Sequence, residues 1–292
     1  MPSERLAVTN DCQYDHSMNN QLASVERFHE LHSSGCFVLP NPFDVGSAKY
    51  LHHLGFQALA TTSAGFAFTQ GLPDGGLSLA PVLKHLHEIV QATPLPVNAD
   101  FQNGYADDPE GVADSVKRCV ATGVAGLSIE DSTGERSQPL YEKSQAIERI
   151  IAARQAIDES GIPVVLTARC ESALVGVDDA FAIALERLPA FAAAGADCLY
   201  APGFTDPEQI KLIVEAVAPK PVNVLVHRPD LGLSVAKLAE LGVRRISVGS
   251  ALARVAWRAF IQAAKKISEA GEFDNLAGPP FEDLNGLFSG KS

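Results

Sequence analysis

The stretch GVAGLSIED, residues 123–131, shows the unit from which most of this chain is built. It opens on a glycine, where a helix is commonly capped, continues as a short apolar run and ends on two carboxylates. The same unit recurs after glycine as LGFQALATTS (54–63), SGIPVVLTAR (160–169), AGADCLYAPG (194–203), LGVRRISVGS (241–250) and CFVLP (36–40). Two runs begin at proline instead, LPVNAD (95–100) and KPVNVLV (220–226). The repeat predicts eight short, buried strands.

Helical patterns separate these runs, and the alternation predicts the fold. Helices are expected at Asp44–Leu54, Pro109–Thr122, Ser144–Ser160, Asp178–Ala194, Asp206–Val217, Ser234–Leu241 and Ala251–Ala270. The strands should end near Pro40, Thr62, Asp100, Glu130, Arg169, Ala201, Val226 and Gly249. Strands that are apolar on both faces and alternate with helices are typical of a parallel sheet covered by helices. Eight units favour a closed (β/α)8 TIM barrel over an open sheet, and no GxGxxG follows the first strand.

The ends of the chain extend beyond this repeat. Residues 1–20 are polar and are interpreted as a flexible N-terminal arm, followed by an N-terminal helix over Gln21–Ser33. Residues 21–270 are interpreted as the barrel catalytic domain. The tail 271–292 contains Gly-Pro-Pro followed by FEDLNGLF, and forms a C-terminal helical extension that packs on the barrel or on a neighbouring subunit.

The composition excludes several classes of partner. The chain has 23 Lys and Arg against 35 Asp and Glu, a net charge of -12, so an interaction with nucleic acid is not expected. No stretch reaches the roughly 18 apolar residues of a membrane helix, and residues 1–20 lack a signal-peptide core, so we expect no membrane and a cytoplasmic location. Five cysteines without a CxxC pair indicate neither a disulfide framework nor a zinc ribbon.

Polar residues collect where the expected strands end. The carboxyl ends of barrel strands form the face on which active sites lie. Asp100 and Glu130 are oxygen ligands suited to Mg²⁺, and Arg169 offers a planar fork for a substrate carboxylate. Ser63 and the small residues after it can provide N–H donors to an oxyanion. Together they predict a site for a small 2-oxo acid, with ion pairs that close the barrel top as the structural alternative.

Further residues were weighed as proton donors or nucleophiles. His227 lies at the expected mouth of the seventh strand, where it is either a general acid or base or an ordinary surface histidine. Tyr105 follows the third strand and is a second candidate proton donor, and a water under a lid is a third. Cys170 should face away from the site by strand alternation, as a buried thiol.

Five stretches together resemble the isocitrate lyase / phosphoenolpyruvate mutase superfamily. They are PNPFDVGSAKYLHHLGF (40–56), TTSAGFAFTQGLPDG (61–75), VNADFQNGY (97–105), GVAGLSIEDSTG (123–134) and TARCES (167–172). The resemblance covers roughly residues 28–263 and implies a (β/α)8 barrel with bound Mg²⁺ or Mn²⁺. It also implies a homo-oligomer, a dimer or a tetramer, that often exchanges the eighth helix between subunits. The chemistry it implies is a C–C or P–C bond reaction through a metal-bound enolate.

The resemblance also assigns site residues by position. Ser63 and Ala64 match the segment that binds the enolate and carboxylate oxygens of the substrate. Asp100 matches the main metal ligand, and Glu130 matches another acid of the metal site. Asp74 matches an outer acid, at the metal and beside the substrate. Arg169 matches the arginine that binds the substrate carboxylate.

The sequence departs from the superfamily pattern in two places. Relatives usually carry an acid two residues beyond the main metal aspartate, where this chain has Gln102. The Lys-x-Cys-Gly-His loop of isocitrate and methylisocitrate lyases is absent, because residues 131–141 read DSTGERSQPLY. The Lys and Asn of the mutase loop are not evident there either.

These observations favour a Mg²⁺-dependent lyase that acts on a small 2-oxo or 2-hydroxy carboxylate. The bond broken would be a C–C bond, either by cleavage or by decarboxylation. One alternative is a P–C mutase or hydrolase of the phosphoenolpyruvate mutase type. Another is a 2-oxoacid-binding barrel without catalysis, which the loss of the cysteine loop and of one acid would permit.

Overall fold

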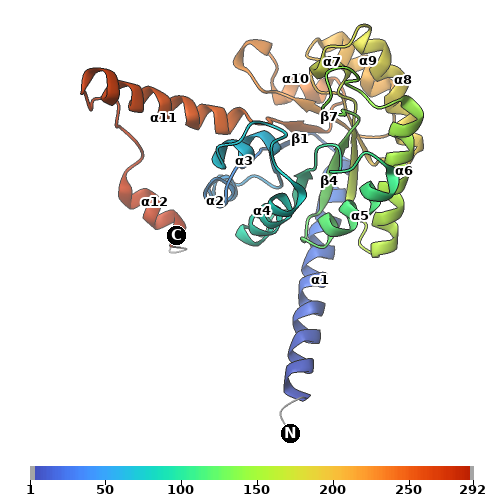
Figure 1. The fold of residues 1–292 in the computed structure, drawn as a ribbon, viewed down its shortest axis with the longest axis horizontal. Helices are drawn as coiled ribbons and strands as arrows, with labels where there is room; N and C mark the ends of the chain where they lie inside the picture. Colours follow the sequence, from blue (N-terminus) through green and yellow to red (C-terminus); the bar gives the residue numbers. More distant parts are fainter. Residues whose placement is uncertain (1–3, 290–292) are drawn as a thin grey trace.

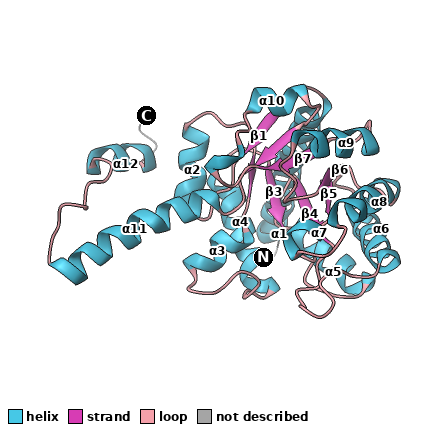
Figure 2. Ribbon diagram, turned by 90° about the horizontal axis from the view of Figure 1, so that it is seen from above, coloured by secondary structure: helices cyan, strands magenta, loops and turns pink. Residues whose placement is uncertain are grey.

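The computed structural model describes the backbone of residues 4–289 and the side chains of residues 18–289. Its centre is a single sheet of eight parallel strands in the order β1-β8-β7-β6-β5-β4-β3-β2. The strands are β1 (Phe37–Leu39), β2 (Leu59–Ala60), β3 (Val97–Asp100), β4 (Gly126–Glu130), β5 (Val165–Arg169), β6 (Cys198–Tyr200), β7 (Val222–Leu225) and β8 (Arg245–Ser247). Helices surround this sheet (Figure 2), which confirms the predicted (β/α)8 barrel. Every strand ends within two residues of its expected end.

The barrel closes between β1 and β2 through the residues that follow β1. Pro40 has no N–H to give to a ladder, but its carbonyl accepts the N–H of Ala60 at 3.0 Å. The buried side chain of Asn41 contacts the segments that follow the two neighbouring strands, β2 and β8. Its amide donates to the Thr61 carbonyl at 2.9 Å, and its oxygen accepts the N–H groups of Val248 and Gly249 at 2.9 Å each.

The helices follow the predicted order with small shifts at their ends. They are α1 (Glu4–Ser33), α2 (Val45–His53), α3 (Ser63–Thr69), α4 (Leu79–Ala92), α5 (Pro109–Val120), α6 (Lys143–Ser160), α7 (Ser172–Val175), α8 (Ala180–Ala193), α9 (Pro207–Val217), the 3₁₀ turn η1 (Pro229–Leu231), α10 (Val235–Glu240), α11 (Ala251–Ala270) and α12 (Phe281–Phe288). The short helices α3 and α7, directly after β2 and β5, were not predicted, and no range was predicted for α4. Asp44 caps α2 in a capping box with Ser47.

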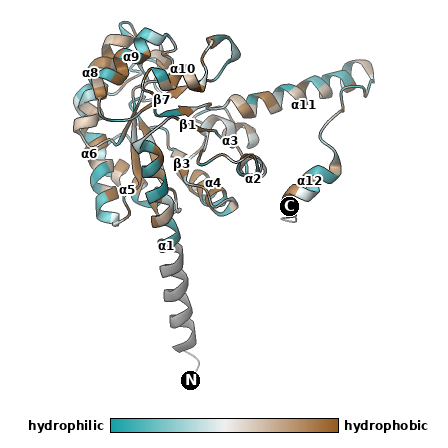
Figure 3. Cartoon of the chain, turned by 180° about the vertical axis from the view of Figure 1, so that it is seen from behind, coloured by the Kyte–Doolittle hydropathy of each residue, from teal (hydrophilic) through white to brown (hydrophobic). Residues whose placement is uncertain are grey.

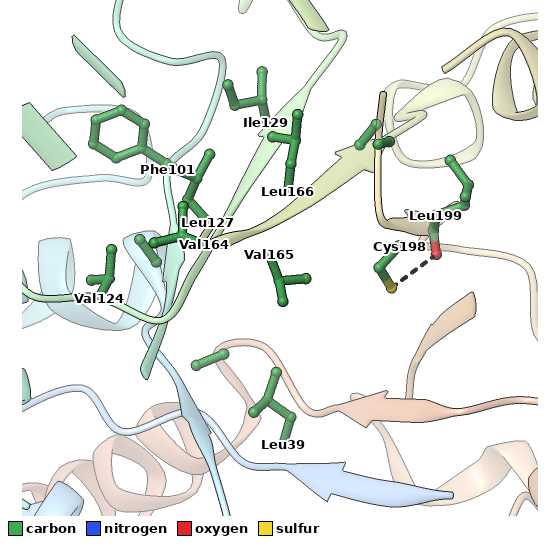
Figure 4. Packing of buried hydrophobic residues seen from close by; sticks show 14 of the residues in the cluster. Leu39, Phe101, Val124, Leu127, Ile129, Val164, Val165, Leu166, Cys198 and Leu199 are labelled. Carbon is green, nitrogen blue, oxygen red and sulfur yellow. Dashed lines mark hydrogen bonds between the residues drawn. The ribbon is translucent and has the colours of Figure 1, made fainter. Parts of the chain in front are cut away.

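The hydrophobic core lies between the outer faces of the strands and the helices. Leu127, Ile129 and Leu166 are at most 1% exposed, and Phe101 closes over them from the segment after β3 (Figure 4). Because successive strand residues point to opposite faces, the residues between these point into the barrel. Several of those inward residues are polar, so the barrel interior differs from the branched apolar filling common in this fold.

The N-terminal helix closes the bottom of the barrel. Val25 and Phe28 of α1 are buried, and Gln21 donates to the carbonyls of Val120 at 2.8 Å and Val124 at 3.0 Å. The helix begins at Glu4 rather than at Gln21, so the backbone of residues 4–20 is helical where an arm was expected. Residues 1–3 of that arm and 290–292 of the tail lie outside the described part of the chain, and the mobility of the arm stays a prediction.

His32, near the end of α1, should make the stability of the closed barrel bottom depend on pH. Its Nδ1 bonds the Phe28 carbonyl at 2.7 Å, and Nε2 lies 3.3 Å from the Arg245 guanidinium. Burial and the Arg245 charge lower the pKa of His32 to about 3. The unfolded chain therefore binds a proton here that the folded chain does not, so stability should be lost as pH falls from about 6.5 towards 3.

We expect this effect to cost up to about 2 kcal/mol of the free energy of unfolding between pH 7 and pH 5. Urea unfolding of the wild type and of His32→Gln at both pH values measures it. The exposed His29, one residue after Phe28, provides the matched control His29→Gln. Equal losses in the wild type and in His32→Gln would contradict the prediction.

The eighth helix of the barrel, α11, leaves the barrel instead of packing against it (Figure 1). Ala253 is the one buried residue of α11, while Trp257 and Phe260 are exposed by 39% and 61%. Hydrophobic and hydrophilic stretches alternate along α11 (Figure 3), and the chain then turns back so that α12 contacts α2. No helix within the described residues is long and apolar enough to cross a membrane.

Candidate active site

A cavity of about 160 Å³ opens at the carboxyl ends of the strands, where the sequence placed the site. The predicted residues Ser63, Ala64, Asp74, Asp100 and Arg169 all line it. The other lining residues come from the eight strands or the segments after them: Leu39, Asn41, Ala60, Thr61, Thr62, Asn98, Ser128, Leu174, Tyr200, Asn223, Leu225, Arg245, Ser247, Gly249 and Ser250.

Arg169 is the centre of the charges at this cavity. Its guanidinium lies 2.6 Å from a carboxylate oxygen of Asp100, 3.2 Å from Glu130 and 2.8 Å from Glu171. The Tyr200 ring covers it, with 5.0 Å between the guanidinium carbon and the ring centroid. The ends of β3, β4 and β5 therefore bring Asp100 and Glu130 into contact with Arg169, although Glu130 itself does not line the cavity.

The site carries more negative than positive charge. Burial raises the pKa of the Glu130 and Glu171 carboxyls, and Arg169 opposes both shifts. Burial alone would lower the pKa of Arg169, but its carboxylate neighbours raise it above the ordinary value. Burial and the charge of Asp100 raise the pKa of Asp74. One guanidinium thus faces several carboxyl groups, which favours an added cation at this place.

Asp100 is held from both sides. One carboxylate oxygen pairs with Arg169, and the other accepts the N–H and the hydroxyl of Ser63 at 2.8 Å each. Its own N–H donates to the Thr61 hydroxyl at 2.9 Å. The Ser63 donors that the sequence assigned to an oxyanion therefore contact the Asp100 carboxylate in this structure. Ala64 follows at the start of α3 and lines the cavity.

The two predicted proton donors lie outside the cavity lining. The Tyr105 hydroxyl is buried and has no hydrogen-bond partner among the described residues. Burial, together with the charges of Asp100 and Glu130, raises its pKa, so the phenol keeps its proton. Burial and the charges of Arg228 and Arg254 lower the pKa of His227.

Two acids close to the site were not assigned to it from the sequence. Glu171 accepts from Arg169 through both Nε and Nη2, at 3.0 and 2.8 Å. It is two residues after Arg169, and strand alternation could have identified it, as it did for Cys170, which is buried and does not line the cavity. Asp131 accepts the Glu171 N–H at 2.8 Å and pairs with Arg187 at 2.8 Å. This buried pair fixes the position of Glu171.

The segment after β3 is held from below by Arg149 of α6. Arg149 is 1% exposed and donates to the carbonyls of Asn103, Ala106 and Asp107. Its guanidinium stacks on Tyr141, with 4.0 Å between the guanidinium carbon and the ring centroid. The Tyr141 hydroxyl donates to Asp107 at 2.5 Å. Arg149 and Tyr141 therefore fix the path of the chain immediately beyond Asp100.

The donor chemistry of the site fits a hard divalent cation. The available groups are carboxylate oxygens, which Mg²⁺ and Mn²⁺ prefer, with excess negative charge around Arg169. Within residues 18–289 no three His, Cys, Asp or Glu side chains are grouped so that they could together hold a metal ion. This arrangement fits an ion held by one or two carboxylates with water and substrate, as is common for Mg²⁺, and not a closed structural zinc site.

Comparisons with known proteins agree with this geometry. The family model of phosphoenolpyruvate phosphomutase matches residues 28–268. The chain belongs to this family. It is 31% identical over 222 residues to 2-methylisocitrate lyase of Escherichia coli K12, covering 69% of this chain and 72% of the relative. It is 31% identical over 237 residues to oxaloacetate decarboxylase of Paraburkholderia xenovorans, covering 77% and 75%.

A solved structure from Burkholderia cenocepacia J2315, which carries only the general name lyase/mutase, is also similar. It is 43% identical, has a TM-score of 0.89, and the match covers 92% of this chain and 98% of that one. The phosphoenolpyruvate phosphomutase family is a family of enzymes, and the named relatives include carbon–carbon lyases. The chain is therefore an enzyme of a family that contains such lyases.

Neither of the two places where the sequence departs from the family pattern lines the cavity. The side chain of Gln102 is close enough to Asp74 to oppose the rise in the pKa of its carboxyl, so the amide stands next to an acid of the site. The loop 131–141 is folded on itself by a bridge between Ser132 and Leu140, and the Thr133 hydroxyl donates to the Gln138 carbonyl at 2.5 Å. This member of the phosphoenolpyruvate phosphomutase family thus has neither a thiol nor an imidazole in that loop.

Proposed function

We propose that this chain is a lyase that breaks a C–C bond of a small 2-oxo or 2-hydroxy carboxylate, by cleavage or by decarboxylation, through an enolate. The observation that supports it best is the contact of Arg169 with both Asp100 and Glu130, beside the cavity that Arg169 and Asp100 line. Decarboxylation suits this chain because it requires stabilisation of an enolate but no thiol acid, and the lyase-type cysteine is absent from residues 131–141.

The residues have distinct tasks in this proposal. Arg169 orients a substrate carboxylate with its planar fork, and the carboxylates around it keep the guanidinium in place. Ser63 and Ala64 line the wall beside the reacting carbons, and Asp100 fixes Ser63 through two hydrogen bonds. His227, Tyr105 and a water under a lid are the three candidates to protonate the product, and neither of the two side chains lines the cavity.

We propose Mg²⁺ or Mn²⁺ as the cofactor. Asp100, with Glu130 and Asp74 directly or through water, would hold the ion. When bound, it would supply Lewis-acid stabilisation of the negative charge that develops on the substrate oxygen. The excess of carboxyl groups over cations at the site supports this assignment.

We also propose that a second copy of the chain covers α11, as part of a dimer or tetramer. The exposed apolar residues of this helix support it: Val255, Trp257, Phe260, Ile261 and Ile267. Exposed apolar surface of this kind marks an interaction site more often than a free surface. Light scattering should give two or four times the mass of one chain, and a monomer would contradict the proposal.

The four described cysteines are free, which supports a cytoplasmic location.

The test of the reaction is a panel of acids with Mg²⁺, with formation of 2-oxo acids measured. The panel holds oxaloacetate, 2-methylisocitrate, dimethylmalate, isocitrate, phosphonopyruvate and phosphoenolpyruvate. We expect metal-dependent release from one C–C substrate, abolished by chelation and restored by Mg²⁺ or Mn²⁺. Turnover of a phosphonate instead would favour a P–C mutase or hydrolase. The name of the family, phosphoenolpyruvate phosphomutase, supports this alternative function. Turnover that persists without any divalent ion would contradict the metal assignment.

A further inference from the structure

A second cation lies at the floor of the active-site cavity. Arg245, the first residue of β8, is 2% exposed and lines the same cavity as Asp100 and Arg169. Its Nε donates to the Asn223 side-chain oxygen at 2.9 Å. Its Nη1 lies 3.3 Å from the His32 ring nitrogen and 3.5 Å from the Asn98 oxygen. Side chains from α1, β3 and β7 thus hold it at the bottom of the barrel.

Every partner of Arg245 is neutral. Asn98 and Asn223 carry no charge, and the pKa of His32 is lowered to about 3, so that its ring is uncharged at neutral pH. No carboxylate pairs with Arg245 within the described residues, and its Nη2 has no hydrogen-bond partner among them. A buried guanidinium without a counter-ion is costly, because burial removes its hydration and nothing replaces the lost charge interaction.

A polar passage joins this floor to the site above. Asn98 lies two residues before Asp100 on the same face of β3, which places it about 7 Å deeper in the barrel. Ser128 of β4, which is in register with Asp100, and Ser247 of β8, two residues beyond Arg245, also line the cavity. The mouth of the cavity is therefore rich in carboxylates, and its floor carries an unpaired cation.

This difference in charge between the mouth and the floor determines which end of a ligand reaches the floor. Arg169 can bind one carboxylate near the mouth, but a second carboxylate is repelled there by Asp74 and Asp100 and attracted by Arg245 at the floor. The free Nη2 of Arg245 provides N–H donors suited to a carboxylate oxygen. Ordinary barrel interiors are filled by apolar side chains, so an open polar floor with an unpaired arginine indicates a binding place for an anionic group.

We propose that Arg245 binds a carboxylate at the floor of the cavity, so that the enzyme selects substrates with two acidic groups. One carboxylate of the substrate contacts Arg245, and the reacting end lies near Asp100 and Arg169. This inference rests on the proposed function for the identity of the ligand as a dicarboxylic 2-oxo or 2-hydroxy acid. A free small anion such as formate carries the same carboxylate group. The experiment therefore distinguishes a substrate carboxylate from a free anion at Arg245.

The test compares two acids that differ only at their distal end, malate and 2-hydroxybutyrate, by calorimetry with Mg²⁺. The wild type should bind malate at least tenfold more tightly. Arg245→Met should weaken malate binding about 10- to 100-fold and leave 2-hydroxybutyrate unchanged, as expected for loss of a charged hydrogen bond. Arg244→Met is the matched control, because it removes the same charge from the adjacent residue, which bonds the Gly35 carbonyl instead of the cavity.

A second measurement does not depend on the proposed reaction. Formate should raise the melting temperature of the wild type and of Arg244→Met, but not that of Arg245→Met. Ser247→Val, which adds bulk to the cavity wall and keeps Arg245, should also lose the formate effect, and it tests the site if Arg245→Met does not fold. A formate effect without preference for malate would assign the floor to a free anion and overturn the substrate role.

The outcomes separate the two proposals. If neither acid binds the wild type but formate stabilises it through Arg245, the proposed function fails and the anion site stands. If Arg245→Met and the wild type bind malate equally and formate has no effect, the floor is not an anion site. Equal losses for malate and 2-hydroxybutyrate in Arg245→Met would also overturn the inference, since they would indicate a general disturbance of the barrel.

Discussion

The Asp100→Asn substitution is expected to lower kcat/KM by about 100- to 1,000-fold on whichever acid the enzyme turns over. Asparagine keeps the shape of the side chain but removes its charge, which pairs with Arg169 at 2.6 Å. Asparagine also has a single oxygen, so its NH2 group must face either the Arg169 guanidinium or the two donors of Ser63. The change therefore weakens the metal site, the position of Arg169 and the wall beside the substrate at once.

The measurement is steady-state kinetics with Mg²⁺, accompanied by a Mg²⁺ titration. The exposed Glu110, in the first turn of α5, provides the matched control Glu110→Gln, which loses the same charge away from the cavity. We expect Glu110→Gln to keep the wild-type kinetics and Mg²⁺ affinity. Retention of more than about a tenth of the activity by Asp100→Asn would show that Asp100 is not central to the reaction.

The sequence predicted the part of the site that follows from strand periodicity. The repeated unit located the ends of β3, β4 and β5 at Asp100, Glu130 and Arg169, and parallel strands bring such ends to one edge. The same periodicity could have identified Glu171, which lies two residues beyond Arg169. The contact between Asp100 and Ser63 could not be predicted, because both donors of Ser63 were also compatible with an oxyanion site.

Other features depend on contacts that no local pattern records. His32 and Arg245 are 213 positions apart, and only closure of the barrel over α1 brings them together. The residues of α11 alone did not predict its position, since an amphipathic helix packs equally well on its own barrel or on another surface. They placed Ala251–Ala270 correctly as a helix, and only the superfamily resemblance, with its exchanged eighth helix, indicated that it leaves the barrel.

Arg149 shows how a residue far from the cavity supports it. The segment after β3 has left-handed backbone at two non-glycine residues, Gln102 with φ of 46° and Tyr105 with φ of 58°. Such backbone is strained for residues with a Cβ, and it persists only where surrounding contacts impose it. Arg149 supplies those contacts by donating to three carbonyls of the segment and stacking on Tyr141.

The Arg149→Met substitution is therefore expected to lower the free energy of unfolding by about 3–5 kcal/mol. Methionine fills much of the same volume but leaves three backbone carbonyls without their donor. Urea unfolding at neutral pH measures the loss. Arg118→Met, at an exposed position of α5, removes the same charge and should change stability by less than about 0.5 kcal/mol.

The same substitution separates support of the fold from support of the site. If Arg149 only fills the space between α5 and α6, the folded variant should keep the wild-type affinity for Mg²⁺ and substrate below its unfolding transition. If Arg149 fixes the segment beyond Asp100, the folded variant should also bind both more weakly, because Gln102 and its neighbour Asp74 would no longer be held at the cavity. A loss of stability below about 1 kcal/mol would contradict both, since it would mean that water replaces all three hydrogen bonds at little cost.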